Sequence, residues 1–324
     1  MLRRWLVLAF ACAMLVGACG GDDDSGGGGG GDSNEVTTLK IGVIPIADVA
    51  PLYLGMEKGY FKDENLEIEP QLAEGGAAIV PAVVSGDYQL GFSNVTSLVI
   101  ATSKKLPVQI IAQGVLGGTG PDSAWDGVVV PKGSKIKEPK DFEGASVAVN
   151  TLNNIGPLVM NESMDKAGAD YTKIKYVEVP FPEMNAALEA GRVDAAWEVE
   201  PAFSGGKAAG GTAIMHPYEE TAPNLTVATY FASKDYIAKN TDVVERFKRA
   251  IEKSLDYAQQ NPDEVRKVIG TYTEIPAEVL DKITLPQWKA DLNEPTIQMN
   301  IDLSKKFGFI EEEPSLDDMI WRGE

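Results

Sequence analysis

The chain has 324 residues and a formal net charge of −19, with 29 Lys and Arg, 48 Asp and Glu, one His and two Cys. This length predicts about two domains with a large buried core. The acidic charge argues against nucleic-acid binding and against docking on anionic lipid through a basic patch. One His cannot build a multi-His metal site, and no Cys or His pair has metal-ligand spacing, so we expect no metal and no cofactor.

The N-terminus has the pattern of a targeting segment. Arg3 and Arg4 precede an apolar stretch over residues 5–16, which is too short to span a bilayer. The stretch ends in LVGAC at residues 15–19, which resembles a bacterial lipobox. We therefore predict a lipoprotein signal peptide over 1–18 and a lipid on Cys19; an ordinary signal peptide is the alternative. Residues 19–36, rich in Gly and Asp, predict a flexible tether that holds the protein outside the cell, on the outer face of its membrane.

The next part of the chain alternates between strand and helix patterns. Strands are predicted over 39–44, 66–70, 88–92 and 108–112, and helices over 51–58, 75–85 and 95–104. Gly86 suits the C-terminal end of the second helix. Strands that alternate with helices of about ten residues predict parallel βαβ units.

The same pattern resumes after residue 125. Strands are predicted over 126–130, 146–150, 174–179, 193–199 and 225–233, and helices over 156–168 and 182–190. The C-terminal part is helical, and Asp242 and Glu245 form a candidate capping pair. One helical face there collects apolar residues, namely Val244, Phe247, Ile251, Leu255 and Ala258.

Two segments repeat at a nearly constant offset. The stretch SGDYQLGF at 85–92 resembles AGRVDAAW at 190–197, and APLYL at 50–54 resembles GPLVM at 156–160. This repeat suggests two similarly built lobes, in which Phe92 and Trp197 end equivalent strands. The alternative is that any two βαβ runs look alike.

The run APLYLGMEKGYFKDENL at 50–66 resembles the opening of the sulfonate, nitrate and thiamine-pyrimidine solute-binding proteins of ABC importers. Further similar segments lie at 75–76, 85–86, 92–94, 141–149, 187–195 and 200–201, so the resemblance covers roughly residues 39–203. It implies an α/β type 2 periplasmic-binding-protein fold with two lobes, a cleft between them and a helical C-terminal region. One lobe would comprise 37–125 plus 224–324, and the other 126–223.

The resemblance also implies a function. The protein would be a monomeric receptor that captures a small molecule in the cleft and delivers it to an ABC permease; a ligand-sensing or interaction lipoprotein with the same fold is the alternative. Fungal enzymes of thiamine-pyrimidine biosynthesis share the fold and have a Cys-rich motif and a substrate histidine. This chain has no Cys after Cys19, and His216 lies in a predicted turn. We therefore expect a binding protein and not an enzyme.

Ligands of open α/β sheets bind beyond the carboxyl ends of the strands. That rule places the candidate ligand-binding residues in the loops after the predicted strands. Several have a plain structural alternative: packing for the two Trp, helix capping for the Asn residues, and solvation for the acids. The candidates are Asp48, Gly76, Phe92, Ser93, Asn94, Trp125, Asp126, Asn153, Asn154, Trp197 and Glu198.

The charges of these loops bear on the ligand. The loops at 46–50, 74–77, 93–96, 114–125, 151–155 and 198–201 contain no Lys or Arg but several acids, among them Asp48 and Glu198. This favours a neutral or cationic heterocycle over a free anion. An anion held by backbone amides near Gly76, Asn94 and Asn153 is the alternative.

Overall fold

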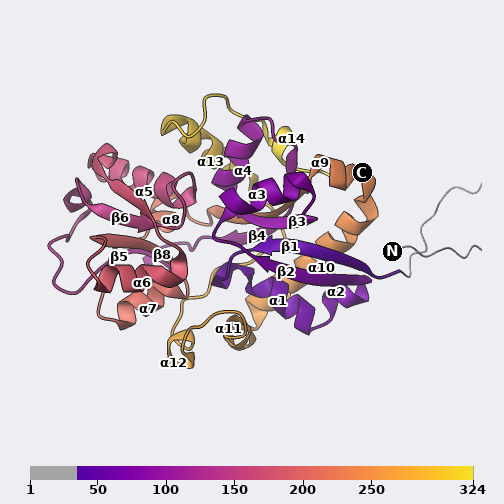
Figure 1. The fold of residues 1–324 in the computed structure, drawn as a ribbon, viewed down its shortest axis with the longest axis horizontal. Helices are drawn as coiled ribbons and strands as arrows, with labels where there is room; N and C mark the ends of the chain where they lie inside the picture. Colours follow the sequence, from indigo (N-terminus) through magenta and orange to yellow (C-terminus); the bar gives the residue numbers. More distant parts are fainter. Residues whose placement is uncertain (1–34, 324) are drawn as a thin grey trace, which may run out of the picture. The chain divides into compact units, whose positions relative to one another are not determined.

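The computed structural model describes residues 35–323, so the predicted signal peptide and Cys19 lie outside the described residues. From Val36 onward the chain forms one unit that contains two five-stranded sheets (Figure 1). The first sheet has the strand order β2-β1-β3-β10-β4 and the second has β7-β6-β8-β5-β9.

The first sheet contains β1 (Thr37–Val43), β2 (Leu66–Leu72), β3 (Leu90–Asn94), β4 (Val108–Leu116) and β10 (Thr226–Ser233). Its helices are α1 (Ala50–Glu57), α2 (Tyr60–Asp63), α3 (Gly76–Ser85) and α4 (Val95–Ser103). Gly86 ends α3 in the left-handed conformation, with φ of 86°, as predicted. The strand and helix patterns of this half are therefore confirmed to within a few residues.

The second sheet contains β5 (Asp126–Val130), β6 (Ser146–Val149), β7 (Lys175–Glu178), β8 (Ala195–Val199) and β9 (Thr212–Met215). Its helices are α5 (Ile155–Lys166), α6 (Phe181–Glu189), α7 (Ala202–Ala208) and α8 (Pro217–Thr221). The short β9 and α8 are not predicted from the sequence.

The two sheets have the same topology. In each sheet the central strand contains the end of the repeated segment: β3 in the first sheet and β8 in the second. Phe92 lies in β3 and Trp197 lies in β8, so the two aromatic residues occupy equivalent strands. The sequence repeat thus corresponds to a structural repeat.

The prediction of parallel βαβ units does not hold for one strand in each sheet. β10 is antiparallel to β3 and β4, and β5 is antiparallel to β8 and β9. Each of these strands is the first that the chain forms after crossing from the other sheet. It starts where its neighbours end, so Asp126 and Thr226 lie at the same sheet edges as the carboxyl ends of β8 and β4.

The C-terminal part consists of α9 (Lys234–Lys239), α10 (Thr241–Gln260), α11 (Pro262–Ile269), α12 (Ala277–Leu280), α13 (Glu294–Lys306) and α14 (Leu316–Met319). The apolar face predicted for α10 is buried and packs on α1 and α2. The capping pair is wrong, because no side chain caps α10 and Asp242 instead pairs with Arg246 at 3.2 Å.

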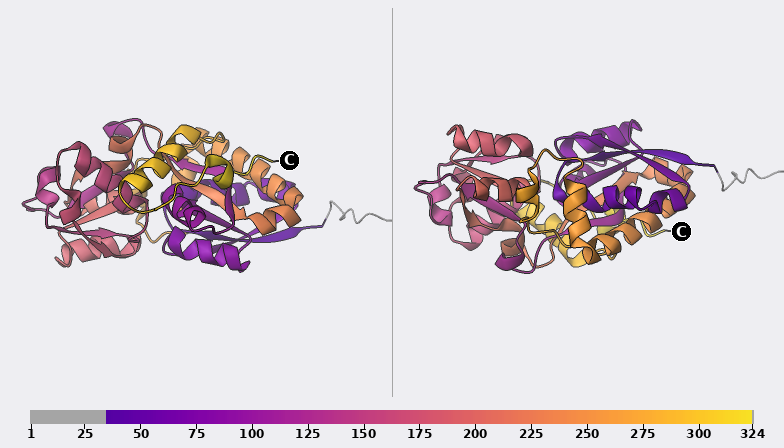
Figure 2. Two further views of the ribbon diagram at one scale, coloured as in Figure 1. Left: turned by 90° about the horizontal axis from the view of Figure 1, so that it is seen from above. Right: turned by 90° about the horizontal axis from the view of Figure 1, so that it is seen from below.

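The helix α13 contacts α4 beside the first sheet and α5 beside the second (Figure 2). Lys306 at its end forms ion pairs with Glu162 at 2.7 Å and Asp165 at 2.8 Å, both on α5. The C-terminal region therefore joins the two halves. Within residues 35–323, no helix combines the length and apolar character needed to cross a membrane.

Candidate ligand-binding site

A cavity lies where the strands of both sheets end. Phe92 and Asn94 of β3 line it from one sheet, and Trp197 and Val199 of β8 line it from the other. Each pair is spaced by two residues because alternate side chains of a strand point to the same face. The remaining lining residues are Ile44, Ile46, Asp48, Asn150, Asn154, Ile155, Phe181, Tyr218, Val227 and Ala228.

Among the described residues that line this cavity, Asp48 is the one acid. It lies in a short 3-10 turn, Ala47–Val49, between β1 and α1, and only 3% of its surface is exposed. Its Oδ1 atom has no hydrogen-bond partner among the described residues. Burial raises the pKa of the Asp48 carboxyl to about 8, because an apolar environment disfavours the charged form.

Three Asn side chains surround the cavity and are held by hydrogen bonds, two of them local. Asn94 caps α4 by accepting from the Ser97 N–H at 2.9 Å, and Asn154 caps α5 by accepting from the Ile155 N–H at 2.6 Å. Asn150 donates from Nδ2 to the Glu74 carbonyl at 3.2 Å. The capping alternative therefore holds for Asn94 and Asn154, and both still line the cavity.

Aromatic rings form a large part of the wall, beside aliphatic side chains. Trp197 packs against Phe181 and Tyr218, with both centroid distances at 5.7 Å. Phe92 packs edge-on against Tyr230 at 5.2 Å. Flat apolar walls of this kind suit a planar ring.

The two halves touch around this cavity. Besides the Asn150–Glu74 bond, the Ala47 N–H donates to the Glu200 carbonyl at 3.0 Å, and the Thr284 N–H donates to the Glu200 carboxylate at 3.2 Å. The cavity volume is about 20 Å³, which is room for about one water molecule. A ring-sized ligand therefore requires the halves to separate before it can enter.

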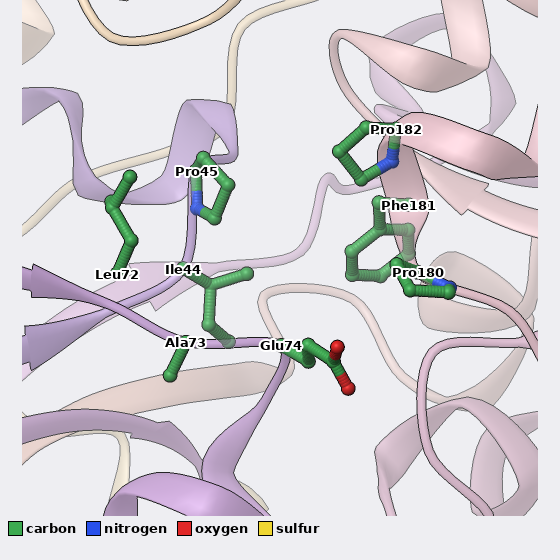
Figure 3. Close-up of a pocket in the computed structure, with 8 residues that line it drawn as sticks. All are labelled: Ile44, Pro45, Leu72, Ala73, Glu74, Pro180, Phe181 and Pro182. Atoms are coloured by element: carbon green, nitrogen blue, oxygen red, sulfur yellow. The ribbon is translucent and has the colours of Figure 1, made fainter.

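Two wider openings adjoin the cavity. The opening of about 230 Å³ in Figure 3 lies between Pro45, Leu72 and Glu74 on one side and Phe181 and Pro182 on the other. A second opening of about 540 Å³ is lined by Tyr272, Glu274 and Ile275 as well as residues shared with the first. Among the described residues that line the cavity and both openings, none is Lys or Arg.

Five of the predicted ligand-binding residues line the cavity: Asp48, Phe92, Asn94, Asn154 and Trp197. Two others lie close behind the wall. A Cβ on Gly76 would stand 1.9 Å from the Ser93 hydroxyl, so Gly76 allows α3 to approach β3, and Ser93 faces that helix. Asn153 is exposed beside the cavity and does not line it.

Trp125 and Glu198 lie away from the cavity. Trp125 is fully buried, donates from Nε1 to the Leu116 carbonyl at 3.1 Å and packs on Tyr218, so it has the packing role. Glu198 is also fully buried but follows Trp197 on the strand and therefore points to the other face. There it approaches Gly206 of α7, and it does not line the cavity.

Asp126 also stands behind the wall. Its Oδ2 atom accepts from Trp197 Nε1 at 2.9 Å, so it contacts a lining residue and does not line the cavity itself.

Sequence reasoning missed Asn150, Phe181 and Tyr218. The sequence predicts that Asn150 ends a strand, but the observed strand β6 ends at Val149. Phe181 is the first residue of α6, shortly after β7. The rule of strand ends includes both once the boundaries are correct. Tyr218 lies in the unpredicted α8, directly after the predicted turn at His216, and the loop rule was not extended to it.

Residues 46–265, about two thirds of the chain, match the NMT1/THI5-like family. The chain belongs to this family. The resemblance found in the sequence is thereby confirmed, and the matched region includes most of the cavity lining.

Two curated relatives are binding proteins. The chain is 25% identical over 243 residues to the formylaminopyrimidine-binding protein of Halalkalibacterium halodurans, covering 74% of this chain and 71% of that protein. It is 26% identical over 210 residues to the taurine-binding periplasmic protein of Escherichia coli, covering 63% and 61%. Fungal pyrimidine phosphate synthases match as well; the one from Candida albicans is 26% identical over 68% of this chain and 67% of the enzyme.

A solved structure confirms the fold class. The alkanesulfonate-binding protein SsuA of Xanthomonas axonopodis pv. citri, bound to MOPS, superposes with a TM-score of 0.75. The comparison covers 89% of this chain and 99% of that chain at 17% identity. The chain therefore has the two-lobe periplasmic-binding-protein fold.

Proposed function

We propose that the protein is an extracytoplasmic receptor of an ABC importer, which captures a small neutral or cationic heterocycle in the cavity between its two sheets. The family and the named binding proteins among its relatives support the receptor role. The observation that carries the ligand class is Asp48, a buried acid in an aromatic cavity whose described lining contains no Lys or Arg.

The chemistry of Asp48 fits a nitrogen heterocycle. With a pKa of about 8, the group is mostly protonated at neutral pH when the cavity is empty. A protonated carboxyl can donate to a ring nitrogen and accept from an adjacent amino group. A cationic ring would instead ionise Asp48 and pair with it. An anion could accept only the single O–H bond of the protonated carboxyl, and no Lys or Arg among the described lining residues would compensate its charge.

The receptor role is proposed in preference to catalysis. The chain has one His, and His216 is bonded through Nδ1 to the Asp126 carbonyl at 2.7 Å and does not line the cavity. The sequence has no Cys beyond Cys19. Because the fungal relatives are named as synthases, catalysis is the alternative function that has to be tested. The ligand experiment below includes that test.

A thermal-shift screen tests the ligand class. The expected result is stabilisation by aminopyrimidines, by about 2.7 kcal/mol for a compound at 100 times its Kd, with recovery of the compound unchanged by mass spectrometry. Taurine, an alkanesulfonate and nitrate serve as the anionic set. Sub-micromolar binding of any of these three, without a response to aminopyrimidines, would contradict the proposal, and a chemically altered compound would contradict the receptor role.

The lipid anchor is a separate part of the proposal. Cys19 follows the predicted lipobox, and both lie outside the described residues. Replacing Cys19 by Ser removes the thiol that would carry the lipid. We expect the variant to leave the membrane fraction after a high-salt wash, whereas the wild type stays. A variant that remains in the membrane fraction would show that the anchor is not on Cys19.

A further inference from the structure

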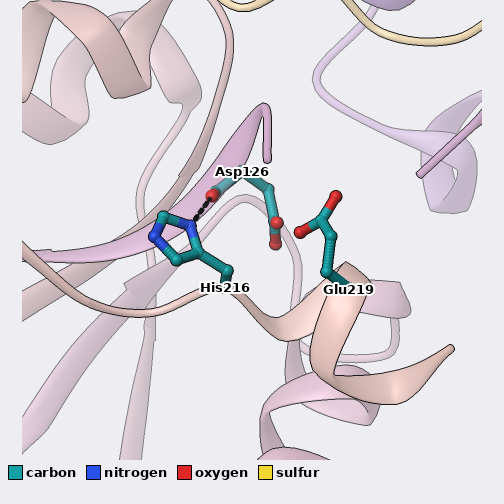
Figure 4. Close-up of side chains that lie close together, drawn as sticks. All are labelled: Asp126, His216 and Glu219. Carbon is teal, nitrogen blue, oxygen red and sulfur yellow. Dashed lines mark hydrogen bonds between the residues drawn. The ribbon is translucent and has the colours of Figure 1, made fainter. Parts of the chain in front are cut away.

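A second group of acids lies behind the cavity wall, where the chain crosses between the sheets. Asp126 opens β5 directly after one crossover, and Glu219 lies on α8 directly before the other. Figure 4 shows the two carboxyl groups face to face, with His216 beside them. The ligand atoms of the three residues lie within 4.8 Å of one another.

The hydrogen bonds leave one oxygen of each acid without a partner among the described residues. Asp126 Oδ2 accepts from Trp197 Nε1 at 2.9 Å, and Oδ1 has no partner. Glu219 Oε1 accepts from the Gly118 N–H at 2.7 Å, and Oε2 has no partner. Asp126 is fully buried. Two adjacent carboxyl groups that each keep an oxygen without a donor are unfavourable unless a proton or a cation lies between them.

We propose that Asp126 and Glu219 share one proton, and that this carboxyl–carboxylate pair positions Trp197 in the cavity wall and ties it to both crossovers. One proton completes every bond. Asp126 Oδ1–H donates to Glu219 Oε2, while Oδ2 keeps the Trp197 bond and Oε1 keeps the Gly118 bond. Asp126 is thus a positioning residue. Its link to ligand binding rests on the proposed function, since it acts through Trp197.

The surroundings favour a proton over a metal ion. His216 Nδ1 is the ring atom nearest the acids, and it already lies 2.7 Å from the Asp126 carbonyl oxygen. A metal bound to that nitrogen would have to displace this bond. Burial and the adjacent Glu219 charge raise the pKa of Asp126 well above its usual range, and burial also raises the pKa of Glu219. Both shifts favour retention of a proton on the pair.

The other titratable groups around Asp126 are few. Among the described residues, His216 just before α8 and Tyr218 on α8 contact Asp126, and Asp48 interacts electrostatically with Tyr218. Burial raises the pKa of Tyr218 well above its usual range, so this group stays neutral. His216 contacts the Asp126 carbonyl through Nδ1 and therefore needs its own control.

The test observes the Trp197 indole N–H directly and needs no ligand. The full-length protein is labelled with ¹⁵N, and its indole signals are followed by NMR between about pH 4 and pH 10. The Trp197 signal is identified by its absence in Trp197→Phe. We expect it to shift in one step, with a midpoint well above the value of about 4 for an ordinary Asp.

Three variants separate the pair from its neighbours. Asp126→Asn keeps a donor toward Glu219 and an acceptor for Trp197, so the signal should keep its position and lose the step. Glu219→Gln removes the adjacent charge and should lower the midpoint by about one pH unit or more. His216→Gln should leave the step in place. The exposed Asp122, in the same crossover, gives the control Asp122→Asn, which should behave as wild type.

Several results would overturn the proposal. A midpoint near 4, or a step that persists in Asp126→Asn, would show that the pair holds no shared proton. A step lost in His216→Gln would assign it to the imidazole. A Trp197 signal that moves on adding Zn²⁺ or EDTA would assign the acids to a metal site instead. None of these outcomes depends on the receptor role, which the ligand screen tests separately.

Discussion

Replacing Asp48 by Asn is expected to stabilise the empty protein at pH 8 and to weaken ligand binding strongly. The wild-type carboxyl has a pKa of about 8 in the folded protein and about 4 in an unfolded chain. The folded state therefore binds the proton more tightly, so the carboxyl's contribution to stability is complete below pH 4 and is lost as the pH rises toward 8. Each pKa unit corresponds to about 1.4 kcal/mol, so the loss amounts to several kcal/mol.

The Asn variant has no charge to bury and should escape this loss. Its melting temperature should exceed that of the wild type by several degrees at pH 8 and match it near pH 4. The control Asp122→Asn makes the same change at an exposed site and should leave both melting temperatures unchanged. Equal melting of wild type and Asp48→Asn across this range would mean that Asp48 is not desolvated.

Binding should change in the opposite sense. Removal of the carboxyl takes away the partner of a buried cation, which costs about 2–5 kcal/mol in comparable pairs. For a cationic ligand the wild type should also release a proton on binding below pH 8, since the ligand ionises Asp48. Isothermal titration in two buffers of different ionisation enthalpy measures this release. Binding of a cationic ligand to Asp48→Asn with full affinity would remove Asp48 from the site, whereas a neutral ring could keep one donor and one acceptor from the Asn amide.

The sequence predicts much of the fold because its signals are local. Turn glycines such as Gly86, and alternating apolar stretches, depend only on neighbouring residues, and the structure confirms them. Strand direction is different. β5 and β10 have the same apolar character as parallel strands, but each starts from a crossover, and only the path of the whole chain reverses them.

The sequence predicts those site residues that can be located from the end of a single strand. Phe92 and Trp197 follow from the repeated segments, and Asp48 follows from the loop after β1. The face of a side chain is harder to predict, because a shift of one residue turns it to the other side of the sheet. That explains why Glu198 points away from the cavity and Trp197 points into it. Asp126 could not be assigned either, since its partner Glu219 lies 93 residues along the chain.

Replacing Gly156 by Ala is expected to displace Trp197 and so to disrupt the cavity from the helix side. Gly156 lies in the first turn of α5. A Cβ at this position would stand 2.5 Å and 2.7 Å from two carbon atoms of the Trp197 ring. Trp197 cannot easily yield, because Phe181 and Tyr218 pack against it and Asp126 accepts from its indole N–H.

Overpacking of this kind costs about 1–3 kcal/mol, which exceeds the gain of about 0.5–1 kcal/mol that Ala brings to a helix. The variant should therefore melt a few degrees lower than the wild type, bind ligand weakly and show a displaced Trp197 indole signal. Gly120→Ala serves as the control, because a Cβ on Gly120 meets nothing within 4 Å.

The double variant Gly156→Ala with Trp197→Phe separates crowding from any other effect of the new methyl group. Phe lacks the outer ring atoms of Trp, so the added Cβ has room, and the two losses of stability should be less than additive. The difference from additivity gives the energy of the clash between positions 156 and 197. Strictly additive losses would show that Gly156 acts on the helix alone, and that the close approach of α5 to β8 does not hold Trp197 in the cavity wall.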